Sequence, residues 1–169
     1  MKISESVLQQ ALQGIERLDQ PDKAANMDAV SASQPHMFDM VLMQKSMGAT
    51  IETMDCLLEI LLTCCNAAEA AGQTPALVSD DTMIAELNRF VQEVGFAADL
   101  PVSALADSVN QYRENHPEPV LFRWALQKLA DAGLTDFATD QRSAVLAGCT
   151  IVNYISRAAG PSVTPKVDA

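Results

Sequence analysis

Polar residues that could support chemistry gather on both sides of a proline-containing turn near residue 116. The members of this group are Tyr112, Arg113, His116, Arg123 and Trp124. If they met where one helix ends and the next begins, they could line a catalytic or ligand-binding pocket. Tyrosine and tryptophan are equally at home in an ordinary helix junction, because they combine an apolar ring with one polar group. We favour ordinary packing and keep the pocket as an alternative.

A set of carboxylates is the best candidate for a metal site. Glu52, Asp55 and Glu59 are spaced by three and four residues, so they share one face of a helix. A dinuclear centre would need matching carboxylates and histidines from other helices, typically as Glu-x-x-His. His36 and His116 each lie beside a proline and outside any such pattern. We therefore interpret the three acids as a solvated helix face and expect neither a metal nor a cofactor.

The sequence contains no motif for nucleophilic catalysis or for phosphate binding. It has neither the G-x-S-x-G pattern nor a glycine-rich phosphate loop. The four cysteines, Cys56, Cys64, Cys65 and Cys149, form no C-x-x-C pair. We expect free thiols that pack as small core residues. An enzyme is therefore the less favoured interpretation.

The charge distribution argues against binding to nucleic acid or to an anionic membrane surface. The formal net charge is −11 at pH 7. Residues 80–110 carry six acids against Arg89 alone, whereas the segment from 111 to the end has six acids and six bases. No basic stripe is available to neutralise phosphates. The acidic segment could attract a basic partner, or it could serve only to keep the protein in solution.

No segment has the pattern of a membrane span or of a secretory signal. The first 18 residues mix charged residues with glutamines and contain no continuous apolar stretch. The longest apolar segment, 54–65, is interrupted by acids and is shorter than the roughly 18 residues that a span needs. We expect a cytoplasmic protein.

The composition favours helices. Apolar residues, mainly Ala, Leu, Val and Met, make up 49% of the chain, and aromatic residues make up 5%. Good helix formers with few aromatic or β-branched runs are typical of an all-α protein. We predict an irregular bundle of about five helices, with one long central helix at about 36–71.

The beginning of the chain is expected to contain a helix followed by a linker. Leu8, Ala11 and Ile15 are among the apolar residues that recur at helical spacing within 1–18. Residues 19–35 are rich in Asp, Ala, Ser, Gln and Pro and show no periodicity, which predicts a flexible linker. The first helix would then be a separate helix or a mobile arm, and the helical domain would span 36–159.

The strongest predicted helix, 36–71, carries most of the methionines. As one continuous helix it would extend about 50 Å. Gly48 is expected only to loosen it, Thr50 is a polar exception in its apolar stripe, and Gly72 would cap its end. Helices of at most about 30 Å could not cover the whole stripe. We therefore expect part of it to contact another chain, through Met40, Met43, Met47, Ile51 and Met54.

Two helices are predicted in the acidic part of the chain. The first begins with Asp80 or Asp81 as its cap and continues to about Val94, with Ile84 among its inward residues. Gly95 would end it. The second would begin at Pro101 and run to the turn near residue 116.

Two further helices complete the predicted bundle. One spans about 118–132 and ends at Gly133. The last spans about 139–159, where Ala144 and Gly148 are small enough for close contact with another helix. Residues 160–169 are predicted to be a disordered tail.

These patterns together favour a non-enzymatic module for protein–protein interaction, such as an adaptor, chaperone, inhibitor or complex subunit. Its partner would be another protein or a second copy of the chain, and neither a nucleic acid nor a membrane. The alternative is a small helical enzyme or ligand-binding bundle with its pocket near Tyr112–Trp124.

Overall fold

The computed structural model describes residues 3–98, 112–134 and 141–158. Within these ranges every regular element is a helix, which confirms the all-α prediction. The predicted helix that starts at Pro101 lies outside the described residues except for its end, where residues 112–115 are helical. The predicted tail, 160–169, also lies outside them.

Most of the N-terminal region is helical, and residues 20–33 form a helix, so the flexible linker predicted at 19–35 is wrong. Helix α1, Glu5–Arg17, begins at Ser4, whose Oγ accepts a hydrogen bond from the Val7 amide at 3.3 Å. Helix α2, Gln20–Ser33, begins at Asp19, whose Oδ1 accepts a hydrogen bond from the Asp22 amide at 3.0 Å. Periodicity was invisible in α2 because it buries only Val30. Helix α1 packs against α4 and α7, so it belongs to the bundle and is not a separate arm.

The predicted single helix at 36–71 is two helices. Helix α3, Pro35–Met43, leads into the short 3-10 helix η1, Gln44–Met47, and α4 starts afresh at Ile51 and ends at Ala70. Gly48, with a φ of 90°, ends the first part: the Ala49 amide donates to the Gln44 carbonyl at 3.0 Å, and the Gly48 amide donates to the Lys45 carbonyl at 3.2 Å. Thr50 then caps α4 by accepting from the Thr53 amide at 3.2 Å. The continuous 50 Å stripe therefore does not exist.

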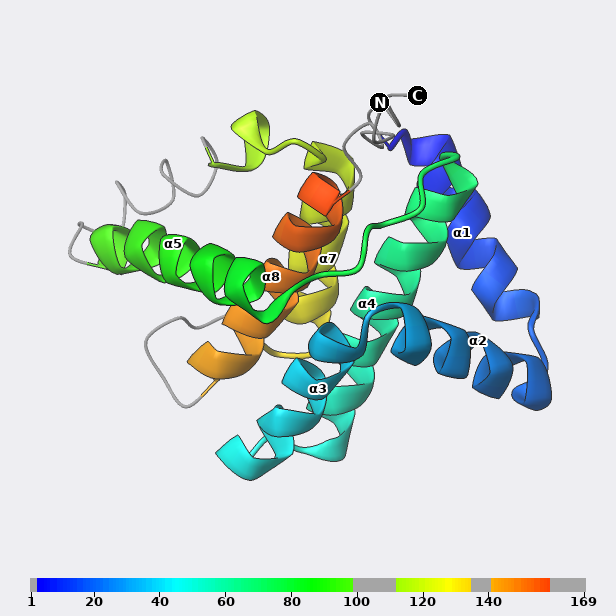
Figure 1. Cartoon of the computed structure of the whole chain (residues 1–169), viewed down its shortest axis with the longest axis horizontal. Helices are drawn as coiled ribbons and strands as arrows, with labels where there is room; N and C mark the ends of the chain where they lie inside the picture. The colour runs from blue at the N-terminus through cyan, green and yellow to red at the C-terminus, as the bar shows by residue number, and fades with distance from the viewer. Residues whose placement is uncertain (1–2, 99–111, 135–140, 159–169) are drawn as a thin grey trace, which may run out of the picture.

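Helix α4 lies at the centre of the bundle (Figure 1), with α1 and α2 on one side and α7 and α8 on the other. Its buried face includes Leu57, Ile60 and Leu61. Helix α7, Pro119–Asp131, and helix α8, Arg142–Ala158, pack against it and against each other. The close contact predicted at Gly148 is present, because a Cβ there would lie 3.0 Å from a methyl carbon of Leu129.

Helix α5, Asp80–Ala98, packs on α8 after an extended segment, 73–79. The buried Gln34 side chain holds this segment by donating to the carbonyls of Pro75 and Ala76 at 3.2 and 3.1 Å. Two details of the prediction are wrong. The helix continues through Gly95, and Ile84 is 53% exposed instead of inward.

Candidate functional site

The predicted pocket residues Tyr112 and His116 do meet, but in the interior. Both hydrogen-bond to one atom, Asn153 Oδ1 on α8: the Tyr112 hydroxyl donates at 3.0 Å, and His116 Nε2 lies 2.8 Å away. The Glu118 amide donates to His116 Nδ1 at 3.0 Å. Since Nδ1 accepts a hydrogen bond, the proton of the neutral ring sits on Nε2 and is donated to Asn153.

The surroundings of His116 are those of a core residue. Its ring stacks on Phe122 at a centroid distance of 4.5 Å, and the Tyr112 ring meets Phe122 edge-on at 5.3 Å. Burial lowers the pKa of His116, and the hydrogen bond to Asn153 only partly offsets that effect. A side chain that is 4% exposed and committed at both ring nitrogens cannot reach a substrate in this conformation.

The other members of the predicted pocket lie elsewhere. Arg123 is exposed and pairs with Glu5 of α1 at 2.6 Å, and Trp124 is partly buried against the core. Arg113 is half-buried at the end of the helical residues 112–115. The partners that sequence reasoning missed are Asn153 and Phe122; Asn153 was visible as a polar residue within the apolar run of α8. Tyr112 and His116 therefore belong to a buried helix junction, and the five predicted residues do not line one pocket.

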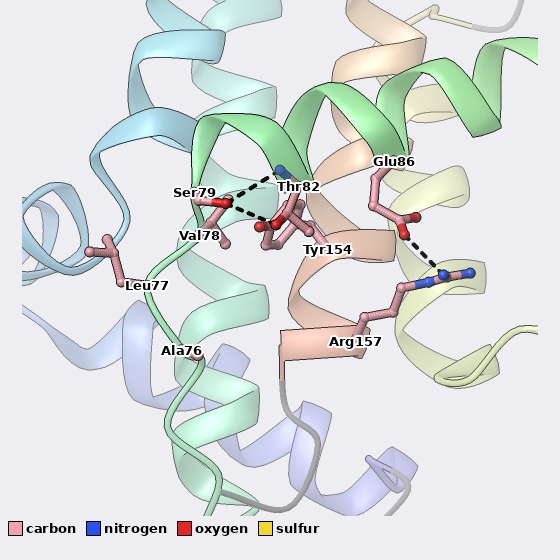
Figure 2. A pocket seen from close by; sticks show the side chains of 8 residues that line it. All are labelled: Ala76, Leu77, Val78, Ser79, Thr82, Glu86, Tyr154 and Arg157. Carbon is pink, nitrogen blue, oxygen red and sulfur yellow. Dashed lines mark hydrogen bonds and ion pairs between the residues drawn. The ribbon is translucent and has the colours of Figure 1, made fainter. Parts of the chain in front are cut away.

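A cavity of about 240 Å³ lies nearby, between the extended segment 73–79, the start of α5 and the end of α8. None of the five predicted pocket residues lines it. In Figure 2 the side chains of Ser79 and Thr82 lie beside Tyr154 at one end, and Glu86 faces Arg157 at the other. Burial raises the pKa of Tyr154, so the phenol is neutral at physiological pH.

The charged groups of this cavity are engaged in ion pairs. Glu86 accepts from Arg157 at 2.9 Å through one carboxylate oxygen, and its other oxygen lies 3.1 Å from Arg89. The volume is below the range of about 300–1,000 Å³ that small-molecule sites usually have. The cavity is therefore smaller than a typical small-molecule site.

The contacts of Glu59 and of the cysteines are those of residues that stabilise the fold. Glu59 pairs with Lys128 of α7 at 2.7 Å, and in the described part of the chain no group of three histidine, cysteine or acidic side chains is placed to hold a metal. All four cysteines are buried and free. Burial raises the pKa of Cys65 and of Cys149 to about 12, and it raises those of Cys56 and Cys64 as well. Thiolates are therefore scarce in the folded protein.

An exposed apolar surface surrounds the break between α3 and α4, and we call it the apolar corner. It consists of Leu42, Met43, Met47 and Ile51, which are 44%, 59%, 59% and 73% exposed. Figure 1 shows this part of the chain, in cyan, projecting at one end of the molecule. Of the five residues predicted to bind a partner, Met43, Met47 and Ile51 lie in the corner, whereas Met40 and Met54 are partly buried. Leu42 was not singled out, although it directly precedes Met43.

Comparison with protein-family models, curated proteins and solved structures finds no match to this chain. No helix among the described residues is long and apolar enough to cross a membrane. The apolar corner holds four of the six exposed large apolar side chains in the described part of the chain.

Proposed function

We propose that this protein is a non-enzymatic interaction module that binds a partner protein through its apolar corner. The observation that carries the proposal is the exposure of Leu42, Met43, Met47 and Ile51 within ten consecutive residues, 42–51. Exposed apolar clusters of this kind are typical of interaction surfaces. Methionine suits such a surface because its flexible thioether side chain adapts to irregular partners.

The break between η1 and α4, and not the length of one helix, leaves these side chains exposed. Gly48 and Thr50 fold the chain back, so Met43 and Met47 lie at a projecting bend and not along a central rod. In the rest of the described chain, only Leu77 and Ile84 are comparably exposed large apolar side chains. They are separated in sequence and supply a natural control.

The apolar area alone would support weak binding. Full burial of such a side chain contributes roughly 1.5–3 kcal/mol, so covering the exposed part of each would contribute about 1 kcal/mol. The total, about 4 kcal/mol, corresponds to a millimolar complex even before the entropy cost of association. Tighter binding needs a further contribution, and the charges around the corner suggest its source.

Acidic residues border the corner on both helices. Asp39 precedes Leu42 and Met43 by three and four residues on α3, and Asp55 follows Ile51 by four on α4, so each shares a helix face with corner residues. Glu52 is fully exposed, and a hydrogen bond from its own backbone amide lowers its pKa, so it is ionised at neutral pH. Lys45 is the one lysine or arginine in the segment 36–55.

The occupant that fits this surface is an amphipathic helix whose apolar face is bordered by Lys or Arg. Such a partner would gain electrostatic complementarity, which adds specificity and speeds association. A second copy of the chain would instead bring another net charge of −11 toward the same acidic border. We therefore favour a basic partner helix over self-association.

A synthetic amphipathic helix of leucine and lysine tests the proposal, with fluorescence anisotropy as the measurement. The comparison peptide has glutamate in place of lysine. The test variant is Met43→Gln/Met47→Gln, and the matched control is Leu77→Gln/Ile84→Gln; neither pair changes the net charge. We expect the test variant to weaken binding of the lysine helix by at least about tenfold, the control to have little effect, and added salt to weaken binding.

Three results would contradict the proposal. The first is equal binding by the test and control variants, which would place the contact elsewhere. The second is equal binding of the glutamate helix, which would remove the role of charge. The third is a wild-type dimer in sedimentation equilibrium that Met43→Lys converts to a monomer, which would make a second copy the occupant.

A further inference from the structure

The sulfur-bearing side chains of the described residues range from fully buried to largely exposed. The four cysteines are buried, and Met37 is fully buried at 0% exposure. Met43 and Met47 are each 59% exposed, and both belong to the apolar corner. Among the methionines of the described residues, these two are the ones that solvent reaches most freely.

Burial and chemistry together decide which sulfur reacts with an oxidant. Thiol oxidation proceeds through the thiolate, and burial suppresses the thiolate of every cysteine here. Thioether oxidation needs no deprotonation and depends on access. An oxidant that reaches this protein from solvent therefore meets the Met43 and Met47 sulfurs before any thiol.

We propose that Met43 and Met47 are the sulfur atoms that peroxide oxidises first among the described residues, and that their oxidation to sulfoxides reversibly removes the docking surface. The second part of this inference rests on the proposed function of the apolar corner. A sulfur lone pair attacks one peroxide oxygen, so that an S–O bond forms as the O–O bond breaks. The sulfur is oxidised by two electrons, and the other oxygen leaves as water with the proton of the transferred oxygen.

The positions of Met43 and Met47 decide what their oxidation does to the protein. A sulfoxide is polar and chiral, so it disrupts an apolar contact. Because both side chains project into solvent, their oxidation leaves the core intact, whereas oxidation of Met37 would place a polar group among buried residues. The fold thus survives a modification that changes the corner. Methionine sulfoxide reductases reverse this chemistry, so the change is not permanent.

The test treats the folded, full-length protein with hydrogen peroxide and follows each sulfur by peptide mass spectrometry over time. We expect Met43 and Met47 to be oxidised first, Met37 and the cysteines later, and the melting temperature to stay unchanged at the stage when only Met43 and Met47 are modified. Retention on a phenyl column should fall at the same stage, which reports loss of apolar surface without any partner.

The last measurement compares binding of the leucine–lysine helix before and after oxidation of the protein. Oxidation should weaken it about tenfold or more, methionine sulfoxide reductases should restore it, and the variant Met43→Leu/Met47→Leu should bind well and resist peroxide. Oxidation of Met37 or of a cysteine as fast as Met43 would overturn the proposed sites. Unchanged column retention and unchanged helix binding after oxidation would overturn the switch. Failure of the untreated protein to bind the helix would contradict the proposed function instead. The order in which the sulfur atoms are oxidised would still test the proposed oxidation sites.

Discussion

Replacement of Gly48 by alanine distinguishes a broken helix from a continuous one by the sign of its effect. Gly48 has a φ of 90°, and no heavy atom lies within 4 Å of the position a Cβ would take. The substitution therefore acts on the backbone alone. In the broken helix it forces alanine into the left-handed region, which is unfavourable for a residue with a Cβ.

The two arrangements predict changes of opposite sign. A left-handed conformation costs an L-residue roughly 1–2 kcal/mol, and the lower entropy of unfolded alanine offsets part of this, so we expect a loss of about 1 kcal/mol. In a continuous helix the same change would stabilise the protein by about 0.8–1 kcal/mol. The expected difference is about 2 kcal/mol, or roughly 4–8 °C in melting temperature for a chain of this size.

Urea unfolding followed by circular dichroism measures this change. Gly14→Ala is the matched control, because Gly14 lies within α1 with nothing within 4 Å of its Cβ position, and it should stabilise the protein. Gly48→Asn should lose less than Gly48→Ala, since asparagine tolerates positive φ better. If Gly48→Ala stabilised the protein as Gly14→Ala does, the break between η1 and α4 would be refuted.

Three further outcomes are expected. Gly148→Ala should destabilise the protein by about 1 kcal/mol or more, although alanine has the better helix propensity. The reason is that the added Cβ would lie 3.0–3.3 Å from methyl carbons of Leu129 and Leu57. Urea unfolding, with Gly14→Ala as the comparison, measures this change. Folding lowers the pKa of His116, so the neutral ring stabilises the folded protein fully above the unfolded pKa of about 6.5. As the pH falls below that value, the free energy of unfolding should decrease by at most about 1.4 kcal/mol per pH unit, until the folded ring also protonates. His116→Gln should remove that part of the slope, and an unchanged slope would contradict the buried neutral ring. An aromatic disulfide reagent should react with the four thiols much more slowly in the native protein than in urea, and fast reaction of any of them would contradict their burial.

The helix boundaries show what local sequence can specify. Gly48, Gly72 and Gly133 all have positive φ and end their helices with the same pair of hydrogen bonds. In each case the glycine amide donates to the carbonyl three residues before it, and the next amide donates to the carbonyl five residues before itself. Caps were predictable at Gly72 and Gly133, because polar or proline-containing segments follow them. The cap at Gly48 was not predicted, because a strong apolar period continues on both sides of it. The cap at Thr50 was present in the sequence as the polar exception in that stripe.

Other parts of the fold depend on contacts that a sequence pattern does not contain. Helix α2 was missed because one buried residue, Val30, gives no period, even though Asp19 and Pro21 are good start signals. Gly95 was expected to end α5, but an isolated glycine costs a helix only about 1 kcal/mol. Ile84 was placed inward by spacing, whereas the face of α5 that meets α8 excludes it.

The candidate sites were predictable as residue groups but not as geometry. Proximity in sequence correctly brought Tyr112 and His116 together, yet it could not reveal that Asn153, far along the chain, holds both of them. Arg123 instead pairs with Glu5 of α1, a contact between residues far apart in sequence that no local pattern indicates. The exposure of Met43, Met47 and Ile51 was expected from a wrong premise, a continuous rod, and the helix break provides the physical reason for it.

Methionine-methyl NMR on the protein with the leucine–lysine helix tests the docking role of the apolar corner most directly. As the helix is added, the methyl signals of Met43 and Met47 should shift or broaden, while that of the buried Met37 should stay in place. Signals that move only at Met27 or Met83, or that do not move at all at saturating helix, would contradict the claim that this corner is where a partner binds.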